Sequence, residues 1–222
     1  MMDREQIVDA NTVNDAYAED NRRFFAQTPT LALNIMGAPG AGKTSLLEKL
    51  ILQLSHNLRA AVIEGDLASV KDAIRISGCN VPVVQINSGR GSILNAKMIN
   101  QVLPGFHMEN IDLLIIENVG NPAIPADLDL GEDLSIFVLS LTGGEDKLAA
   151  YAESCKRADA IVLNKVDLLA QTGLALDDVI ERVTEINPGA KIFQTCCRHG
   201  DIEGIEAIST YLTQLARAKR QG

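Results

Sequence analysis

The sequence predicts an α/β fold with a largely parallel sheet of about seven strands and helices on both faces. Seven short apolar runs, rich in Val, Ile and Leu, recur along the chain with helix-like stretches between them: residues 31–37, 59–65, 81–87, 111–119, 134–141, 160–166 and 190–196. The runs are almost continuously hydrophobic, which is typical of strands buried on both faces and not of a one-sided antiparallel sheet. Strands that alternate with helices in this way build a sheet with helices on both sides.

Size and charge narrow the class of protein. A chain of 222 residues buries about two thirds of the surface that its unfolded form exposes, so no structural metal or disulfide is expected. The net charge of −9 repels nucleic acid and anionic lipid. No apolar run approaches the ~20 residues that span a bilayer, the first twenty residues do not resemble a secretion signal, and the 4 cysteines are irregularly spaced. We expect a cytoplasmic protein that binds neither nucleic acid nor membrane.

We expect residues 1–28 to form an N-terminal helical segment and residues 29–222 to form one nucleotide-binding domain. The apolar positions of the segment, which are spaced to line one face of a helix, are Ile7, Val13, Tyr17 and Phe24. Such a face docks either on the chain's own domain or on a partner protein, and the first is the commoner case.

The glycine-rich stretch GAPGAGKTS follows the first apolar run and precedes the helix expected over residues 45–54. It fits the phosphate-binding pattern G-x-x-x-x-G-K-S/T in the context that the pattern requires. Backbone N–H groups at the helix N-terminus are expected to bind phosphate oxygens, Lys43 to contact the β and γ phosphates, and Thr44 to ligate Mg²⁺. The nucleotide-binding residues predicted here are Gly37, Gly40, Ala41, Gly42, Lys43, Thr44 and Ser45.

Acidic residues end two other apolar runs and complete a candidate Mg²⁺ and water site. Glu117 lies at the end of its run, where P-loop proteins place an acid that holds the metal or its water shell. Glu64 and Asp66 end another run. Hydrolysis would be in-line attack of water on the γ-phosphate, with Asp66 and Asp72 as candidates for orienting the water and the backbone N–H of Gly120 for contacting the phosphate.

The motif NKVD, residues 164–167, follows the sixth apolar run and indicates which base is bound. The carboxylate of Asp167 accepts hydrogen bonds from the N1 and N2 edge of guanine, whereas adenine has no donors at these positions. Lys165 is expected to lie over the base, and Asn164 to join neighbouring loops. The sequence therefore predicts GTP and GDP as ligands.

The stretch TCCRHGD after the last apolar run is expected to place the backbone of Cys196 and Cys197 beside the guanine oxygen. These cysteines and His199 also form the one local group of soft metal ligands in the sequence, so a metal site is the alternative. The isolated Cys79 is expected to be an ordinary packed residue.

The sequence resembles the HypB family, the nickel-insertion GTPases of hydrogenase maturation, which are related to the urease accessory GTPase UreG. The resemblance extends from about Asn21 to the C-terminal helix, and its most specific blocks are IEGD, ENVGN, DLGE and GEDK. It implies a P-loop domain of the SIMIBI type and a GTPase that dimerises in the triphosphate state. The implied partners are a nickel-delivery protein of the HypA type and the large subunit of apo-hydrogenase. It further implies that Asp66 and Glu117 are the switch carboxylates, and that Lys147 contacts the nucleotide across the dimer.

The chain departs from the family where relatives carry transition-metal ligands. Ser92, Ile93 and Ile124 occupy the positions of a Cys, a His and a second Cys. Isoleucine has no lone pair to donate, and a serine hydroxyl is a poor ligand for Ni²⁺ or Zn²⁺. We therefore expect the metal site between the two switches to be missing.

Three functions remain open. The chain is a maturation GTPase whose partner carries the nickel, or a GTP-gated scaffold or regulator that does not bind nickel or that serves another metalloenzyme. The third is a P-loop kinase for a small molecule, which would have no need of the NKVD motif.

Overall fold

A computed structural model of the chain describes residues 10–65, 78–86, 94–118, 128–143, 148–196 and 202–222. Seven strands form one sheet in the order β3-β2-β4-β1-β5-β6-β7, and every pairing is parallel. The strands are β1 (Leu31–Gly37), β2 (Ala60–Glu64), β3 (Val83–Gln85), β4 (Leu113–Glu117), β5 (Leu134–Ser140), β6 (Ala160–Asn164) and β7 (Lys191–Thr195). The predicted fold class is confirmed.

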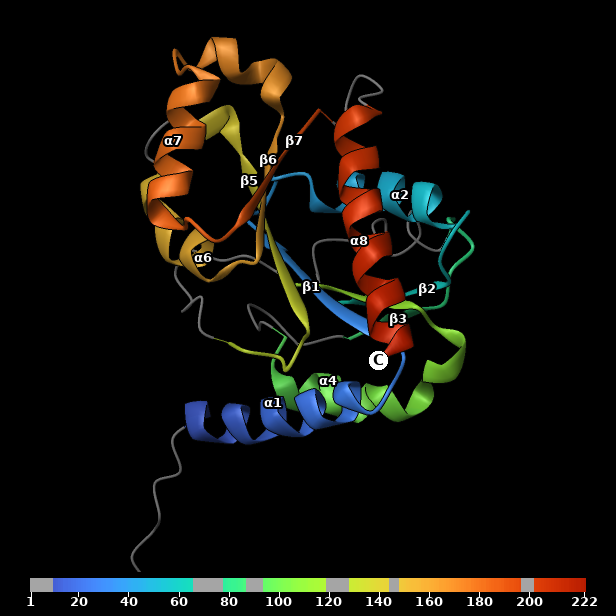
Figure 1. Cartoon of the computed structure of the whole chain (residues 1–222). Helices are drawn as coiled ribbons and strands as arrows, with labels where there is room; N and C mark the ends of the chain where they lie inside the picture. Colours follow the sequence, from blue (N-terminus) through green and yellow to red (C-terminus); the bar gives the residue numbers. More distant parts are fainter. Residues whose placement is uncertain (1–9, 66–77, 87–93, 119–127, 144–147, 197–201) are drawn as a thin grey trace, which may run out of the picture.

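Six α-helices lie in the described residues, together with four short 3₁₀ turns (Figure 1). The α-helices are α1 (Ala10–Ala26), α2 (Lys43–Leu54), α4 (Ala96–Val102), α6 (Ala152–Arg157), α7 (Leu176–Ile186) and α8 (Glu203–Gln221). The 3₁₀ turns are η1 (Leu103–Gly105), η2 (Met108–Asn110), η3 (Leu141–Gly143) and η4 (Val166–Gln171). None of these helices is both long and apolar enough to cross a membrane.

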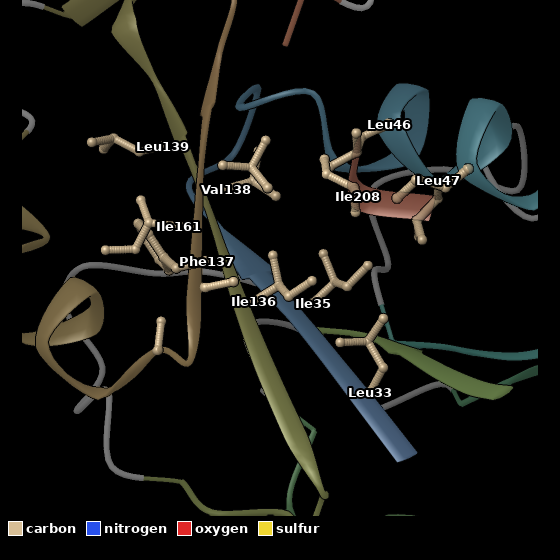
Figure 2. Close-up of a cluster of buried hydrophobic side chains, with 14 of the residues drawn as sticks. Leu33, Ile35, Leu46, Leu47, Ile136, Phe137, Val138, Leu139, Ile161 and Ile208 are labelled. Carbon is tan, nitrogen blue, oxygen red and sulfur yellow. The ribbon is translucent and has the colours of Figure 1, made fainter. Parts of the chain in front are cut away.

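Hydrophobic side chains on both faces of the sheet form the core. On one face, Ile35 and Ile136 lie beside Leu46 and Leu47 of α2 and Ile208 of α8 (Figure 2). On the other face, α1 and α4 cover β2, β4 and the first half of β1. Because side chains alternate along a strand, β1, β2 and β4 contribute to both clusters, which explains why these runs in the sequence are continuously apolar.

The edge strand β3 is shorter than its apolar run predicts, with Val83–Gln85 in place of 81–87. Its side chains are half-buried or exposed, in contrast to the fully buried strands β2 and β4. An edge strand pairs on one side alone, so its ends are held less well.

Helix α1 docks on the chain's own domain, as expected, but the face that it buries agrees only in part with the one predicted. The residues of α1 that are buried are Asn14, Ala18, Asn21 and Phe25. Val13, predicted to face the domain, is 38% exposed, and Tyr17 and Phe24 are half-buried. Of the predicted residues, Phe24 packs against the core and Ile7 lies outside the described residues. The prediction missed the two asparagines, which occupy the buried face and bond to the backbone of distant segments.

Helix α8 runs along the sheet from the carboxyl ends of the strands to their amino ends (Figure 1). Its last turn is fixed by ion pairs of Arg220 with Asp112 and of Lys219 with Asp133. Arg59 also binds Asp112, and this hydrogen bond is the main reason that the pKa of Asp112 falls from 3.8 to about 2.

Candidate functional site

The glycine-rich loop joins the end of β1 to the start of α2, at the carboxyl edge of the sheet. Gly40 and Gly42 have φ angles of 72° and 97°, which an L side chain rarely adopts. A Cβ atom on Gly42 would also lie 2.5 Å from Nδ2 of Asn164. Gly42 is the N-cap of α2, so no side chain covers the first-turn N–H groups, and this end of the helix is suited to bind an anion.

Lys43 is held inside this loop. Its side chain is 5% exposed, and Nζ donates a hydrogen bond to the carbonyl oxygen of Gly37 at 3.0 Å. At Gly37 the strand passes close to β5, since a Cβ atom there would lie 2.5 Å from the carbonyl oxygen of Val138. The loop therefore fixes one ammonium group at its centre, where a phosphate would need a counter-charge.

Thr44 and two strand-end carboxylates gather beside the loop. Oγ1 of Thr44 donates to Oε1 of Glu117 at 3.0 Å. Glu117 and Glu64 are partners in the parallel register of β4 and β2, so their side chains leave the same face of the sheet. Both are fully buried. A hydroxyl and carboxylate oxygens are the ligands that Mg²⁺ prefers, and a divalent cation would compensate two buried negative charges, so the residues present fit this ion.

The NKVD motif and the phosphate loop both follow the carboxyl ends of strands in the same parallel sheet. Only β5 lies between their strands, β6 and β1, so the two segments are close enough to contact. Nδ2 of Asn164 donates to the carbonyl oxygen of Ala41 at 2.7 Å, while its Oδ1 accepts from Oγ1 of Thr195 at 3.0 Å. Lys165 has a φ of 66°, and its Nζ donates to the carbonyl oxygen of Gly40. Asp167 is exposed in η4. Asn164 thus has the bridging position expected for it, and its part in base recognition stays a prediction.

Several predicted site residues lie outside the described part of the chain: Asp66, Asp72, Ser92, Ile93, Gly120, Ile124, Lys147, Cys197 and His199. Cys196 is described and lies buried directly after β7. Within the described ranges, no three His, Cys, Asp or Glu side chains lie close enough to hold a metal ion. Because the positions of the relatives' ligands are outside these ranges, the missing nickel site stays a prediction.

Cys79 packs against the hydrophobic core, as expected. Burial and the nearby Glu48 raise the pKa of its thiol. Both effects disfavour the thiolate, which is the form that binds metals.

A polar pair beneath the site, a buried asparagine and a half-buried glutamate, was not foreseen. Nδ2 of Asn34, in the middle of β1, donates to Oε1 of Glu132 at 2.9 Å. Oε2 of Glu132 accepts from the backbone N–H of Leu130. Burial raises the pKa of Glu132, and the hydrogen bonds from Asn34 and from backbone partly offset this. The signal was present in the sequence, because Asn34 interrupts an otherwise apolar run and Glu132 belongs to the DLGE block.

Comparisons with known proteins agree with this geometry. Residues 31–194 match the family model described as CobW/HypB/UreG, nucleotide-binding domain. Hydrogenase maturation factor HypB of Escherichia coli is 39% identical over 194 residues, which make up 87% of this chain and 67% of that protein.

Two solved structures are similar over nearly their whole length. HypB from Archaeoglobus fulgidus has a TM-score of 0.83 and 35% identity, covering 92% of this chain and 98% of its own. HypB from Helicobacter pylori, solved in complex with nickel, has a TM-score of 0.82 and 31% identity, covering 95% and 98%. The chain therefore belongs to the CobW/HypB/UreG family of nucleotide-binding proteins, on its HypB branch.

Proposed function

We propose that this chain is a GTP-binding and GTP-hydrolysing switch that acts in nickel insertion during maturation of nickel-iron hydrogenase. The observation that carries the proposal is the position of Asn164. One buried amide joins the phosphate loop, through Ala41, to the motif that ends in Asp167. The candidate phosphate site and the carboxylate that would recognise guanine are thereby kept at a fixed distance from each other. The likeness to hydrogenase maturation factors supports a role in hydrogenase maturation.

The chemistry is in-line attack of water on the γ-phosphate, and the residues contribute position and charge. The loop N–H groups and Lys43 hold the phosphates. Thr44, Glu117 and Asp66 would hold Mg²⁺, which supplies positive charge to the phosphate oxygens when bound. Asp66 and Asp72 orient the water, and the backbone N–H of Gly120 contacts the γ-phosphate.

Nickel is cargo in this proposal, and its route depends on the substituted positions. A relative was solved with nickel, whereas this sequence has Ser92, Ile93 and Ile124 at the ligand positions of the family. We therefore assign the nickel to a partner of the HypA type, with the apo-hydrogenase large subunit as the recipient. This chain supplies timing as a homodimer that forms with GTP, in which Lys147 contacts the nucleotide of the second copy.

The same substitutions favour a second candidate, a GTP-gated scaffold or regulator that does not handle nickel, or a GTPase that serves another metalloenzyme. Both candidates assume that this chain does not itself bind nickel. Equilibrium binding of Ni²⁺ and Zn²⁺ to the reduced protein, with GDP and with a non-hydrolysable GTP analogue, tests this assumption. Tight binding of about one metal per dimer would contradict the assignment of nickel to the partner. The mass in solution, measured alongside, tests the nucleotide-dependent dimer.

Base recognition is tested with the substitution Asp167→Asn. Wild type is expected to bind GDP about 10⁴-fold more tightly than ADP, because a site built to pair with donors rejects a base without them. Asp167→Asn should weaken the binding of GDP and strengthen the binding of xanthosine diphosphate, because the C2 carbonyl of xanthine accepts a hydrogen bond from the new amide. Asp178→Asn, an exposed aspartate of α7, is the control and should change neither affinity. Equal affinities of wild type for ADP and GDP would support the kinase alternative and overturn the proposal.

A further inference from the structure

Helix α1 is bonded to two chain segments that are far apart in the sequence. The first, here called the Leu94 arm, is residues 94–96, at the start of α4. The second, called the Glu132 arm, is residues 129–132, just before β5. Figure 1 shows α1 lying along α4 on one side of the sheet. The two asparagines on the buried face of the helix make the connection.

Each asparagine bonds to both arms. Asn14 accepts from the backbone N–H of Ala96 at 2.9 Å and donates to the carbonyl oxygen of Asp129 at 2.8 Å. Asn21 donates to the carbonyl oxygens of Ala96 and Leu130, each at 2.9 Å. Both backbone groups of Ala96 are therefore held by the same helix. Breaking such bonds at a buried position leaves polar groups without water, so the arms are held firmly.

The helix is seated too closely on the Glu132 arm for a side chain to intervene. Gly131 has a φ of 81°, and a Cβ atom there would lie 2.2 Å from the carbonyl oxygen of Ala18. Asn21 is completely buried, and its Oδ1 accepts from Nδ2 of Asn100 in α4 at 2.9 Å. The glycine of the DLGE block thus permits the contact, and polar bonds fix the position along the helix.

Both arms lead to the candidate phosphate site. Leu94 is completely buried and lies against Gly65, where a Cβ atom would be 2.3 Å from its side chain. Gly65 follows Glu64 and donates to the carbonyl oxygen of Glu117 at 3.0 Å. On the other side, Glu132 accepts from Asn34 in β1, the strand that ends in the phosphate loop.

We infer that Asn14 and Asn21 are positioning residues for GTP hydrolysis, which act by keeping the two arms in a fixed relation. The inference rests on the proposed GTPase function. Neither asparagine contacts the phosphate loop, so GDP is held without them. Hydrolysis requires Glu64, Glu117 and the loop to be aligned together, and a displacement of about 1 Å at a reacting group costs up to about 100-fold in rate.

The test compares Asn14→Ala and Asn21→Ala with the control Asn187→Ala. Asn187 is a similar cross-linking amide that donates to the carbonyl oxygens of Cys155 and Ala158, on the other half of the sheet. We expect the single-turnover rate of GTP hydrolysis to fall about 10- to 100-fold in the first two variants. Their Kd for GDP should stay within about threefold of wild type, because no nucleotide contact is lost. The control loses stability but keeps the wild-type rate.

Two results would overturn the inference. One is wild-type hydrolysis by folded Asn14→Ala, which decides the matter if Asn21→Ala does not fold. The other is a hydrolysis rate that falls equally in Asn187→Ala, which would show a loss of stability alone.

Hydrogen exchange separates this inference from the proposed function. If wild type binds GDP but does not hydrolyse GTP, the proposed function fails, and exchange then decides whether Asn14 and Asn21 couple the two arms to the nucleotide site. Replacing GDP by a GTP analogue should then change amide protection in residues 10–26 of wild type, and this change should disappear in Asn14→Ala. A helix α1 whose protection is the same with both nucleotides would contradict the coupling.

Discussion

The substitution Asn164→Ala should lower both stability and nucleotide affinity, and the two losses can be separated. The side chain is 1% exposed and takes part in three hydrogen bonds. It joins the phosphate loop at Ala41, the end of β7 at Thr195, and the backbone of Lys165. Alanine removes all three bonds at once and leaves two of the partners, Ala41 and Thr195, buried.

The structure sets the size of both effects. At about 0.5–1.5 kcal/mol for each bond, the free energy of unfolding should fall by about 2–4 kcal/mol. For a domain of this length that corresponds to a fall in Tm of about 5–15 °C. The phosphate loop also loses its hydrogen bond to the NKVD motif. A tenfold weaker Kd for GDP would reduce the stabilisation by saturating GDP by about 1.4 kcal/mol, or about 3–6 °C.

The assay is thermal unfolding followed by circular dichroism, with and without GDP, on wild type, Asn164→Ala and Asn187→Ala. Asn187 donates to three backbone carbonyls far from the loop, so its variant should lose stability and keep the full shift on adding GDP. The reasoning is refuted if Asn164→Ala keeps the wild-type shift on adding GDP. It is also refuted if the Tm of the free protein falls by less than about 2 °C.

Two further substitutions test the packing and the ion pairs. Gly65→Ala should lower the free energy of unfolding, measured with denaturant, by about 1–3 kcal/mol, because its Cβ would overlap the buried Leu94 side chain. The double variant Gly65→Ala with Leu94→Ala should lose less free energy of unfolding than the two single variants together. The pKa of Asp112 is lowered to about 2, mainly by the hydrogen bond from Arg59. The ionised carboxylate therefore stabilises the folded chain at pH values above its ordinary pKa of 3.8, and this stabilisation is lost as the pH falls toward 2. Unfolding free energies at pH 5, 4 and 3 should therefore show the advantage of wild type over Asp112→Asn shrinking with falling pH, and a constant difference would contradict this cause.

The repeating elements were predictable because the five inner strands are buried on both faces and each motif is local. A short, continuously apolar run such as 113–117 is expected to be a strand in the middle of a parallel sheet, where both of its faces are buried. The phosphate loop and NKVD were likewise recognisable, since their spacing is set by the ligand and not by the rest of the fold. Asn34 could have been noticed as a polar interruption of such a run.

The order of the strands and the polar contacts across the fold could not be predicted from local pattern. Glu64 and Glu117 become neighbours because β2 pairs with β4, and no local feature near either residue shows this pairing. The docking face of α1 was missed for a related reason. A helix is expected to bury its apolar residues, but Asn14 and Asn21 are buried because segments 75 or more residues away in the sequence supply their hydrogen-bond partners.

The central position of β1 bears on how the chain folds as it is synthesised. Leu31–Gly37 pairs on one side with β4 and on the other with β5, so its second neighbour is complete only when Ser140 has been made. At about 5–20 residues per second, the ribosome needs about 5–20 seconds to advance from Gly37 to Ser140. During that interval this strongly apolar strand lacks one or both of its neighbours in the sheet. The centre of the sheet can therefore be completed only after more than half of the chain has been synthesised.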